Sequence, residues 1–379
     1  MALKICNRCI IDESVSGTSF DKKGICNYCK THDILDKLFP INDKFLDIIE
    51  KIKKDGSKGK YDCIVGLSGG RDSTFTLYLV KKYGLRPLAV HFNDGFGNPV
   101  SGLNMKKALE KTGVELRTIT SDWRESKDIK IATLKASVPD LEVGTDLGIA
   151  NALYGTATKE NIKYILSGTS FRTEGIAPLE WNYLDGKYLK SIIKKHGTVK
   201  LRKWSPNNPG FNLEVKHILY YTIYKRIKMV PILYYYNYNR QEAENIIKEE
   251  FDWINTGAHY YDDLYQSLMA NILRIKFNID FRKFNYSALV RSKQMDRSDA
   301  LERIKKVYTI EDPKVIDLCI KRLGLTLEQY EKFNIEKTKT FRDYNTNYDI
   351  IKFFKIPIKI LSKLNFFHPI TYYKFFGDE

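Results

Sequence analysis

The feature that most constrains this chain is a glycine-rich turn placed between an apolar strand and a helix. Residues 62–67 form an apolar run that predicts a buried strand, and residues 73–83 have helical periodicity. The turn between them reads Ser-Gly-Gly-Arg-Asp-Ser. Its glycines let the backbone approach an anion closely, and the amides at a helix start carry partial positive charge. The sequence therefore predicts a phosphate-binding loop made by Ser68, Gly69, Gly70, Arg71, Asp72 and Ser73.

Asp72 is unusual in such a loop, because its carboxylate would repel a phosphate group. A Mg²⁺ ion that bridges the carboxylate and the phosphate would remove this repulsion. The loop lacks the Gly-Lys-Ser/Thr sequence of a Walker A motif. The sequence does not decide whether Arg71 contacts phosphate or faces solvent. A glycine turn that happens to carry serines is the alternative, and the flanking strand and helix disfavour it.

Strands and helices alternate around this loop, a pattern typical of an α/β fold with a doubly wound parallel sheet. Helical patterns separate the predicted strands. These strands cover residues 62–67, 86–93, 115–119 and 164–167.

Three parts of the chain differ in composition and pattern. We expect a cysteine-bearing module at 1–35, an α/β domain at 36–205 that starts with a helical pattern at 36–55, and a mainly helical region at 206–379. In the last region, Asn239 and Thr326 have the character of helix N-caps, since Glu242 and Gln329 follow three residues later.

Polar residues stand at the end of the second predicted strand. Asn93 and Asp94 occupy the carboxyl edge of the sheet, where ligands bind in open α/β folds. We expect both residues to contribute to a nucleotide site. His91 lies within the strand, and we interpret it as a core histidine rather than a ligand contact.

Four of the six cysteines form two close pairs near the N-terminus. Each pair has the Cys-x2-Cys spacing that presents two sulfurs to one tetrahedral ion. Four thiolates leave no open coordination position, so we expect a structural zinc site. An iron–sulfur cluster and four free thiols are the alternatives. The expected metal ligands are Cys6, Cys9, Cys26 and Cys29.

The formal net charge of +16 and a pI near 9.3 favour polyanionic partners or reflect a lysine-rich surface, and charge alone does not decide between them.

The sequence contains no run of about 18 uncharged apolar residues that would predict a membrane-spanning helix. The first residues, MALKICNRC, do not have the apolar core of a signal peptide. We therefore expect a cytoplasmic protein.

The hexapeptide at 68–73 resembles the PP-loop of the N-type ATP pyrophosphatases. Residues 139–146, 166–176 and 181–183, together with the cysteine pairs, resemble the N-acetyl sugar amidotransferase family. That family belongs to surface-glycan pathways and includes the pseudaminic acid (flagellin glycosylation) and O-antigen (lipopolysaccharide) amidotransferases. The resemblance covers roughly residues 1–300.

The resemblance implies an ATP-dependent amidotransferase that releases AMP and pyrophosphate. AMP would be placed on the oxygen of an N-acetyl group, and ammonia would then replace that oxygen to give an acetamidino group. The substrate would be an activated acetamido sugar, either a nucleotide-sugar or a nonulosonic acid. The implied cofactors are ATP, Mg²⁺ and structural Zn²⁺.

The resemblance also implies roles for residues that follow the fourth predicted strand. Arg172 and Glu174 would contact substrate or phosphate, and a surface ion pair is the alternative for both. Asp72 and His259 complete the candidate catalytic set. The other candidates are nucleotide contacts at Gly168, Thr169 and Ser170 and substrate contacts at Thr173, Glu174, Gly175, Trp181 and Tyr183.

The chain departs from the family pattern at residues 253–262. The family has a Gly-Gly-Lys-His-His-Glu-Ser run there, whereas this sequence keeps one glycine and His259. The departure bears on the substrate and on whether the chain is active. Four downstream residues still match the family pattern, namely Ser287, Arg291, Gln294 and Arg297.

The source of ammonia is expected to be a separate protein. Position 2 is Ala2 rather than the cysteine of a self-contained glutaminase, and neither Cys63 nor Cys319 has an evident histidine partner. The family then implies a separate glutaminase and a cyclase-like subunit that channels ammonia. We do not expect nucleic acid as a partner.

Two other functions compete with this interpretation. A tRNA-modifying PP-loop enzyme, of the thiolation or lysidine-forming kind, would also carry a zinc knuckle and positive charge. A non-catalytic binding protein that keeps the fold would account for the altered residues 253–262. The tail from residue 350 interleaves lysine with phenylalanine, isoleucine and tyrosine. We expect it to pack on the body or on a partner, and peripheral membrane contact is the alternative.

Overall fold

The computed structural model describes residues 3–206, 210–255, 263–307 and 313–377. At its centre lies one sheet of five parallel strands in the order β3-β2-β1-β4-β5. This confirms the expected doubly wound α/β fold. The strands are β1 (Cys63–Gly66), β2 (Pro87–Asn93), β3 (Leu116–Thr120), β4 (Tyr164–Ser167) and β5 (Lys228–Pro231).

Successive residues of the central strand point to opposite faces of the sheet, and both faces are buried. Cys63 and Val65 pack into one apolar cluster, while Ile64 packs into another. A strand buried on both faces reads as a continuous apolar run, and for this reason residues 62–67 were recognisable in the sequence.

Helices cover both faces of the sheet. On one face lie α2 (Lys44–Gly56), α3 (Arg71–Lys82), α4 (Pro99–Thr112) and α9 (Arg240–Phe251). On the other lie α5 (Trp123–Ala136), α6 (Val143–Lys159), α7 (Gly186–His196) and the short α8 (Val215–Leu219), which continues into a π-helical turn, η1 (Tyr220–Tyr224).

The helical pattern at 36–55 is two helices rather than one. The first, α1 (Asn27–Leu38), ends before Phe39, and α2 begins at Lys44. Pro40 explains the break, because it has no amide hydrogen and disfavours a helical residue before it. Helix α1 starts inside the cysteine module and runs past residue 35, so that expected boundary falls within a helix.

The C-terminal region is mainly helical, as expected, but it also supplies β5, which the sequence did not reveal. The Asn239 side chain accepts hydrogen bonds from the amides of Gln241 and Glu242, and Thr326 forms a capping box with Gln329. The remaining helices are α10 (Leu264–Phe277), α11 (Arg282–Arg291), α12 (Arg297–Lys305), α13 (Lys314–Arg322), α14 (Leu327–Ile335), α15 (Tyr348–Phe353), α16 (Lys355–Lys363) and α17 (Pro369–Phe376).

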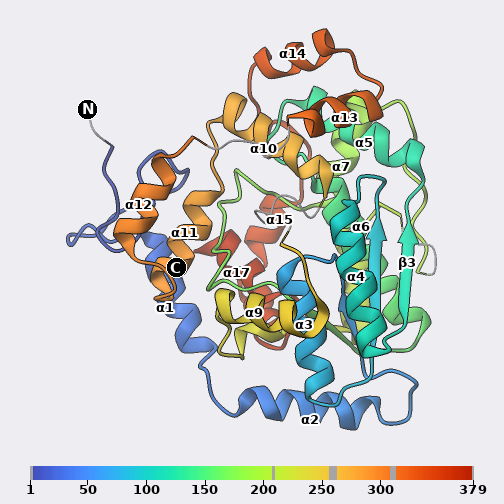
Figure 1. Cartoon of the computed structure of the whole chain (residues 1–379). Helices are drawn as coiled ribbons and strands as arrows, with labels where there is room; N and C mark the ends of the chain where they lie inside the picture. Colours follow the sequence, from blue (N-terminus) through green and yellow to red (C-terminus); the bar gives the residue numbers. More distant parts are fainter. Residues whose placement is uncertain (1–2, 207–209, 256–262, 308–312, 378–379) are drawn as a thin grey trace.

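The N-terminal module lies beside α11 and α12, on the side of the molecule opposite β3 (Figure 1). Two hydrogen bonds fix this contact: the Arg297 guanidinium donates to the carbonyls of Cys6 and Cys9 (2.8 and 3.1 Å). Among the described residues, no helix has both the length and the apolar character needed to cross a membrane.

Candidate active site and metal centre

The strand order creates a switch point between β1 and β4. The connection after β1 runs to α3 on one face of the sheet, and the connection after β4 runs to α7 on the other. Ligands of open parallel sheets bind in the crevice at such a point. Both polar loops singled out in the sequence leave the sheet here.

The loop after β1 is closed by hydrogen bonds among its own residues. The hydroxyl oxygens of Ser68 and Ser73 lie 3.0 Å apart, and the Ser68 amide donates to the Ser73 hydroxyl oxygen (3.2 Å). The Gly70 amide donates to the Ser68 hydroxyl oxygen (3.3 Å). The result is a compact turn that leads directly into the first turn of α3, where amide dipoles favour an anion.

Gly69 is required by the shape of this loop. Its φ is +83°, and a Cβ built there would lie 2.1 Å from the carbonyl oxygen of Ser101 on α4. The Gly69 carbonyl accepts hydrogen bonds from the side chains of Asn104 (3.2 Å) and Trp253 (3.0 Å). Both partners lie outside the motif, so its sequence does not reveal them.

Asp72 is buried and has protein partners. Its carboxylate accepts a hydrogen bond from the Arg71 Nε (2.9 Å) and another from the Tyr238 hydroxyl. Burial and the neighbouring Asp72 raise the pKa of Tyr238 well above its usual range, so that hydroxyl remains a donor. The Arg71 side chain is only 11% exposed, so it does not face solvent, and its contact with phosphate stays a prediction. Because Arg71 balances the carboxylate, repulsion of phosphate does not by itself require Mg²⁺, and the ion stays a prediction.

The loop after β4 touches the phosphate loop and the C-terminal tail. A Cβ at Gly168 would lie 2.8 Å from the Asp72 carbonyl oxygen, so the two loops are in close contact. The Thr169 hydroxyl lies 2.9 Å from Nε2 of His368. The amide of Ile370 donates to Nδ1 of the same ring, which leaves the proton on Nε2. Burial and the nearby Lys374 lower the pKa of His368 to about 4, so the ring is neutral near pH 7.

The carboxyl end of β2 holds a buried ion pair. Asp94 accepts hydrogen bonds from Lys130 Nζ (2.7 Å) and the Thr145 hydroxyl (2.9 Å), and both side chains of the ion pair are 2% exposed. Burial opposes the charged form of Asp94, but Lys130 outweighs it and lowers the pKa of the carboxyl. Asn93 accepts from the amide of Gly95 (3.0 Å). Lys130 was missed in the sequence.

His91 makes a structural contact. Its Nδ1 lies 3.0 Å from the Leu67 carbonyl oxygen, at the point where the chain leaves β1. Burial lowers the pKa of the ring, so it is neutral near pH 7. His91 is only partly buried and also lines the cavity described below, so it braces the start of the phosphate loop without being enclosed in the core, and its interpretation as a core histidine stays a prediction.

A cavity of about 1150 Å³ lies along the carboxyl edge of the sheet. It exceeds the usual volume of a site for one small ligand, about 300–1,000 Å³, and so has room for a nucleotide beside a second molecule. Helix α6 and the tail helices form much of its apolar wall. Six of the predicted site residues line it: Ser68, Asn93, Asp94, Gly168, Thr169 and Glu174.

Arg172 is engaged by the protein interior rather than by the cavity. Its guanidinium donates to Asp36 (2.9 Å) and to the carbonyls of Phe39 (2.8 Å) and Tyr234 (2.9 Å). Arg172 therefore ties the end of α1 to the segment after β5. These contacts are those of a residue that positions neighbouring segments of the chain. The catalytic role expected for Arg172 stays a prediction.

The neighbours of Arg172 in the same loop divide between the cavity and the interior. Glu174 lines the cavity, and its carboxylate accepts a hydrogen bond from the Ser170 amide (3.4 Å). Thr173 is buried, and its hydroxyl lies 3.5 Å from the Ser170 carbonyl oxygen. Gly175 has a φ of +77° and lies against Phe284.

Trp181 and Tyr183 are packed into the interior. The Trp181 ring makes edge contacts with Phe281 and Phe284 (centroids 5.6 and 5.1 Å apart), in the cluster that surrounds the cysteines. Tyr183 is fully buried and stacks on Phe341 with centroids 4.2 Å apart. Neither is among the residues that line the cavity, so their predicted substrate contacts have no support from this arrangement.

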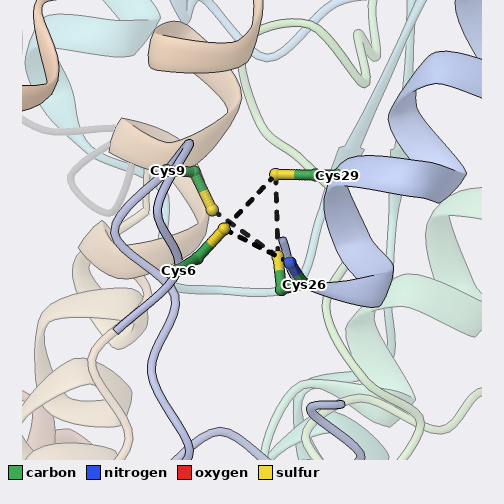
Figure 2. Close-up of side chains that lie close together, drawn as sticks. All are labelled: Cys6, Cys9, Cys26 and Cys29. Carbon is green, nitrogen blue, oxygen red and sulfur yellow. Dashed lines mark hydrogen bonds between the residues drawn. The ribbon is translucent and has the colours of Figure 1, made fainter. Parts of the chain in front are cut away.

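The four cysteines converge on one point, as Figure 2 shows. All four are buried, and their sulfur atoms lie within 4.8 Å of one another. The sulfur separations include 3.6 Å for Cys26–Cys29, 3.7 Å for Cys9–Cys26 and 3.8 Å for Cys6–Cys29. Such a group is suited to hold a metal ion. In the described part of the chain, no other group of three or more His, Cys, Asp or Glu residues does so.

Three of the four family-pattern residues contact this module. The Ile10 amide donates to the Ser287 hydroxyl (3.3 Å), and Arg291 Nη1 lies 3.6 Å from the Cys9 sulfur. Arg297 binds the two cysteine carbonyls described above. The fourth, Gln294, instead accepts from the Arg240 amide (2.9 Å) beside the Tyr238 loop. His259 lies outside the described residues.

Comparison with known proteins gives one family match. Residues 255–357 match the model described as "LPS biosynthesis protein WbpG-like, C-terminal domain". No curated protein matches the chain.

Several solved structures align over much of the chain. One is the U34-tRNA thiolase NcsA from Methanococcus maripaludis with its [4Fe-4S] cluster (13% identity, 86% of this chain and 99% of that chain, TM-score 0.32). Another is the NH3-dependent NAD synthetase from Campylobacter jejuni (16% identity, 80% of this chain and 97% of that chain, TM-score 0.30). A third is the NMN synthetase from Francisella tularensis (13% identity, 78% of this chain and 97% of that chain, TM-score 0.30). These scores are too low to assign the chain to any of those groups. Over its C-terminal part, the chain is similar to WbpG-like LPS biosynthesis proteins.

Proposed function

We propose that this protein is an ATP-dependent amidotransferase that converts the N-acetyl group of an activated sugar into an acetamidino group. One observation carries the proposal: a Ser-Gly-Gly-Arg-Asp-Ser turn, closed by its own hydroxyls, stands at the switch point of a parallel sheet, and its first residue, Ser68, lines a cavity with room for two ligands. The similarity of residues 255–357 to LPS biosynthesis proteins supports a substrate from surface-glycan synthesis.

The chemistry follows from the poor leaving ability of an amide oxygen. Attack of that oxygen on the α-phosphorus of ATP would form an O-adenylyl imidate and release pyrophosphate. Ammonia would then add to the imidate carbon, and AMP would leave with the former amide oxygen. The turn at Ser68–Ser73 and the start of α3 would hold the departing pyrophosphate through amides and hydroxyls.

The cysteine site is proposed to hold zinc. A tetrahedral ion with Zn–S bonds of about 2.3 Å separates its sulfur ligands by about 3.8 Å. The three separations of 3.6–3.8 Å given above agree with that value. A four-iron cluster would spread the thiolates further, since each binds a different iron. Metal analysis of the purified protein should find stoichiometric zinc; stoichiometric iron with visible absorbance would overturn this assignment.

Ammonia is proposed to come from a separate glutaminase through a channelling subunit. Within this chain, Cys63 is fully buried in β1 and burial raises the pKa of its thiol. Burial also raises the pKa of Cys319 to about 12. Neither group offers the thiolate that a glutaminase or a sulfur-transfer enzyme needs.

The substrate change can be measured directly. Nucleotide-activated acetamido sugars are incubated with the protein, ATP, Mg²⁺ and ammonium chloride, and the sugars are analysed by mass spectrometry. Conversion should lower the mass by the difference between oxygen and NH, and only when ATP and ammonium are both present. A panel of such sugars left unchanged, together with salt-sensitive binding of tRNA, would favour the tRNA-modifying alternative.

A further inference from the structure

Helices α15 and α16 carry an apolar face that points away from the rest of the protein. Four side chains on it are more than half exposed: Phe353 (83%), Ile356 (71%), Ile360 (53%) and Leu364 (52%). Their spacing of three or four residues places them along one side of a nearly continuous helical segment. Isolated exposed apolar residues are common, but four in one row are not explained by packing within this chain.

A row of lysines runs beside this apolar face. Lys352, Lys355, Lys359 and Lys363 have the same spacing, each one position before an apolar residue of the row. Between residues 350 and 377 the sequence contains no aspartate or glutamate. Three of these lysines lie over aromatic rings of the same segment, including Lys359 over Tyr372 (5.3 Å), which keeps their charges near the helix surface.

The opposite side of the same segment is anchored to the protein. Ile358 packs with Tyr372 and Phe376 of α17. The Lys374 ammonium donates to the Asn182 carbonyl (3.0 Å), and His368 contacts Thr169 as described above. The amphipathic face is therefore held in place relative to the sheet.

The cavity opens beside this face. Its lining includes Ile350 and Phe354 of the tail and Ile149, Leu184 and Leu219 of the body. Each of these five side chains is between 39% and 53% exposed, so they form an apolar rim around the opening. The rim continues the exposed apolar row of α15 and α16.

We propose that the face formed by Phe353, Ile356, Ile360, Leu364 and the adjacent lysines binds an anionic membrane surface and brings the cavity opening to that surface. A helix with an apolar face flanked by lysines lies in the bilayer interface, where anionic headgroups attract the lysines. Asp349 in the first turn of α15 is the one carboxylate that α15 and α16 carry, and the resulting excess of lysine favours anionic phospholipid over a protein surface that needs complementary ion pairs. The inference holds whether or not the proposed amidotransferase reaction does.

The test is sedimentation with unilamellar vesicles. The full-length protein should bind vesicles that contain phosphatidylglycerol and should bind pure phosphatidylcholine vesicles much more weakly. Replacing the lysines Lys352→Gln, Lys359→Gln and Lys363→Gln should weaken binding by at least about tenfold, since each basic residue near the surface contributes roughly fivefold. The matched control replaces Lys106, Lys111 and Lys194, which are exposed elsewhere, by Gln and makes the same change in net charge.

A second variant tests the apolar row. The double substitution Phe353→Ser and Ile356→Ser should also weaken binding about tenfold. The control is Leu327→Ser with Ile335→Ser on α14, where the side chains are 61% and 84% exposed. Thermal melting checks that every variant folds.

Three results would overturn the proposal. One is the absence of binding to anionic vesicles, and another is binding that the two control variants reduce as much as the tail variants do. The third is a dimer, measured by light scattering, that the Phe353→Ser and Ile356→Ser variant dissociates. In that case the face joins two copies of the chain instead.

Discussion

The two polar loops at the switch point are built in different ways. The turn after β1 is closed by its own residues, Ser68, Gly70 and Ser73, although Asn104 and Trp253 also bind it from outside the motif. The loop after β4 is held by residues far away in the sequence, with His368 bound to Thr169 and Asp36 bound to Arg172. A contiguous motif preserves its contacts at fixed spacing, whereas a loop completed by remote segments has no such signature. The first loop therefore reveals its chemistry in the sequence, and the second does not.

The largest effect on stability and activity is expected at the loop after β1. Gly69→Ala should lower the free energy of unfolding by about 2–4 kcal/mol and abolish ATP–pyrophosphate exchange, because the new Cβ meets the Ser101 carbonyl at a positive φ. Gly102→Ala on α4 is the control, since a Cβ there meets nothing within 4 Å. Urea unfolding and exchange assays measure both effects. A Gly69→Ala protein that is as stable and active as the control would show that the loop shape is not needed.

A somewhat smaller effect is expected at Arg172. Arg172→Lys should cost about 2–3 kcal/mol of stability, because a lysine cannot serve Asp36 and two carbonyls at once. Turnover per folded molecule should change little. Arg124→Lys, at an 83% exposed side chain, should change stability by less than about 0.5 kcal/mol. Loss of turnover at unchanged stability would instead make Arg172 a catalytic residue.

A hydrogen bond from Tyr238 joins the segment before α9 to the phosphate loop, and removing one oxygen atom breaks it. Tyr238→Phe removes the hydroxyl that donates to Asp72 and should cost about 1–2 kcal/mol. The KM for ATP should rise if Asp72 then moves away from the start of α3. Tyr224→Phe, at a 72% exposed side chain, serves as the comparison and should be neutral. Unchanged stability and KM in Tyr238→Phe would mean that the Tyr238 hydroxyl does not hold Asp72 in place.

The smallest effect is a pH dependence at the tail. The pKa of His368 is about 4 in the folded protein against 6.5 as its ordinary value. Between these values the unfolded chain binds a proton that the folded chain does not, so stability should fall as the pH is lowered from about 6.5 to about 4. His368→Gln should remove about 1 kcal/mol of the difference in unfolding free energy between pH 7 and pH 5.5. Equal pH dependence in both proteins would show that the ring titrates freely.

The fold could be predicted where the evidence is local. Strand β1, the turn and α3 each carry a periodic or compositional signal, and so do the two cysteine pairs. Strand β5 could not be found, because its four residues, Lys-Met-Val-Pro, show neither alternation nor a long apolar run. Its place in the sheet depends on pairing with β4.

Some of the missed site residues had a weak signal. Lys130 lies on the buried face of α5, four residues after Ser126 and four before Leu134, both of which are buried. A lysine at such a position needs an opposite charge, and Asp94 is that partner. Tyr238 and His368 had no comparable signal, because only the folded chain brings them to Asp72 and Thr169.

The central claim is that the turn from Ser68 to Ser73 holds the β and γ phosphates while the α phosphate is transferred. The most direct measurement is separation of the nucleotide products by anion-exchange chromatography after turnover with ATP, ammonium and an accepted sugar. The account predicts AMP and pyrophosphate in equal amounts, and their loss in Gly69→Ala. Release of ADP and phosphate would contradict it.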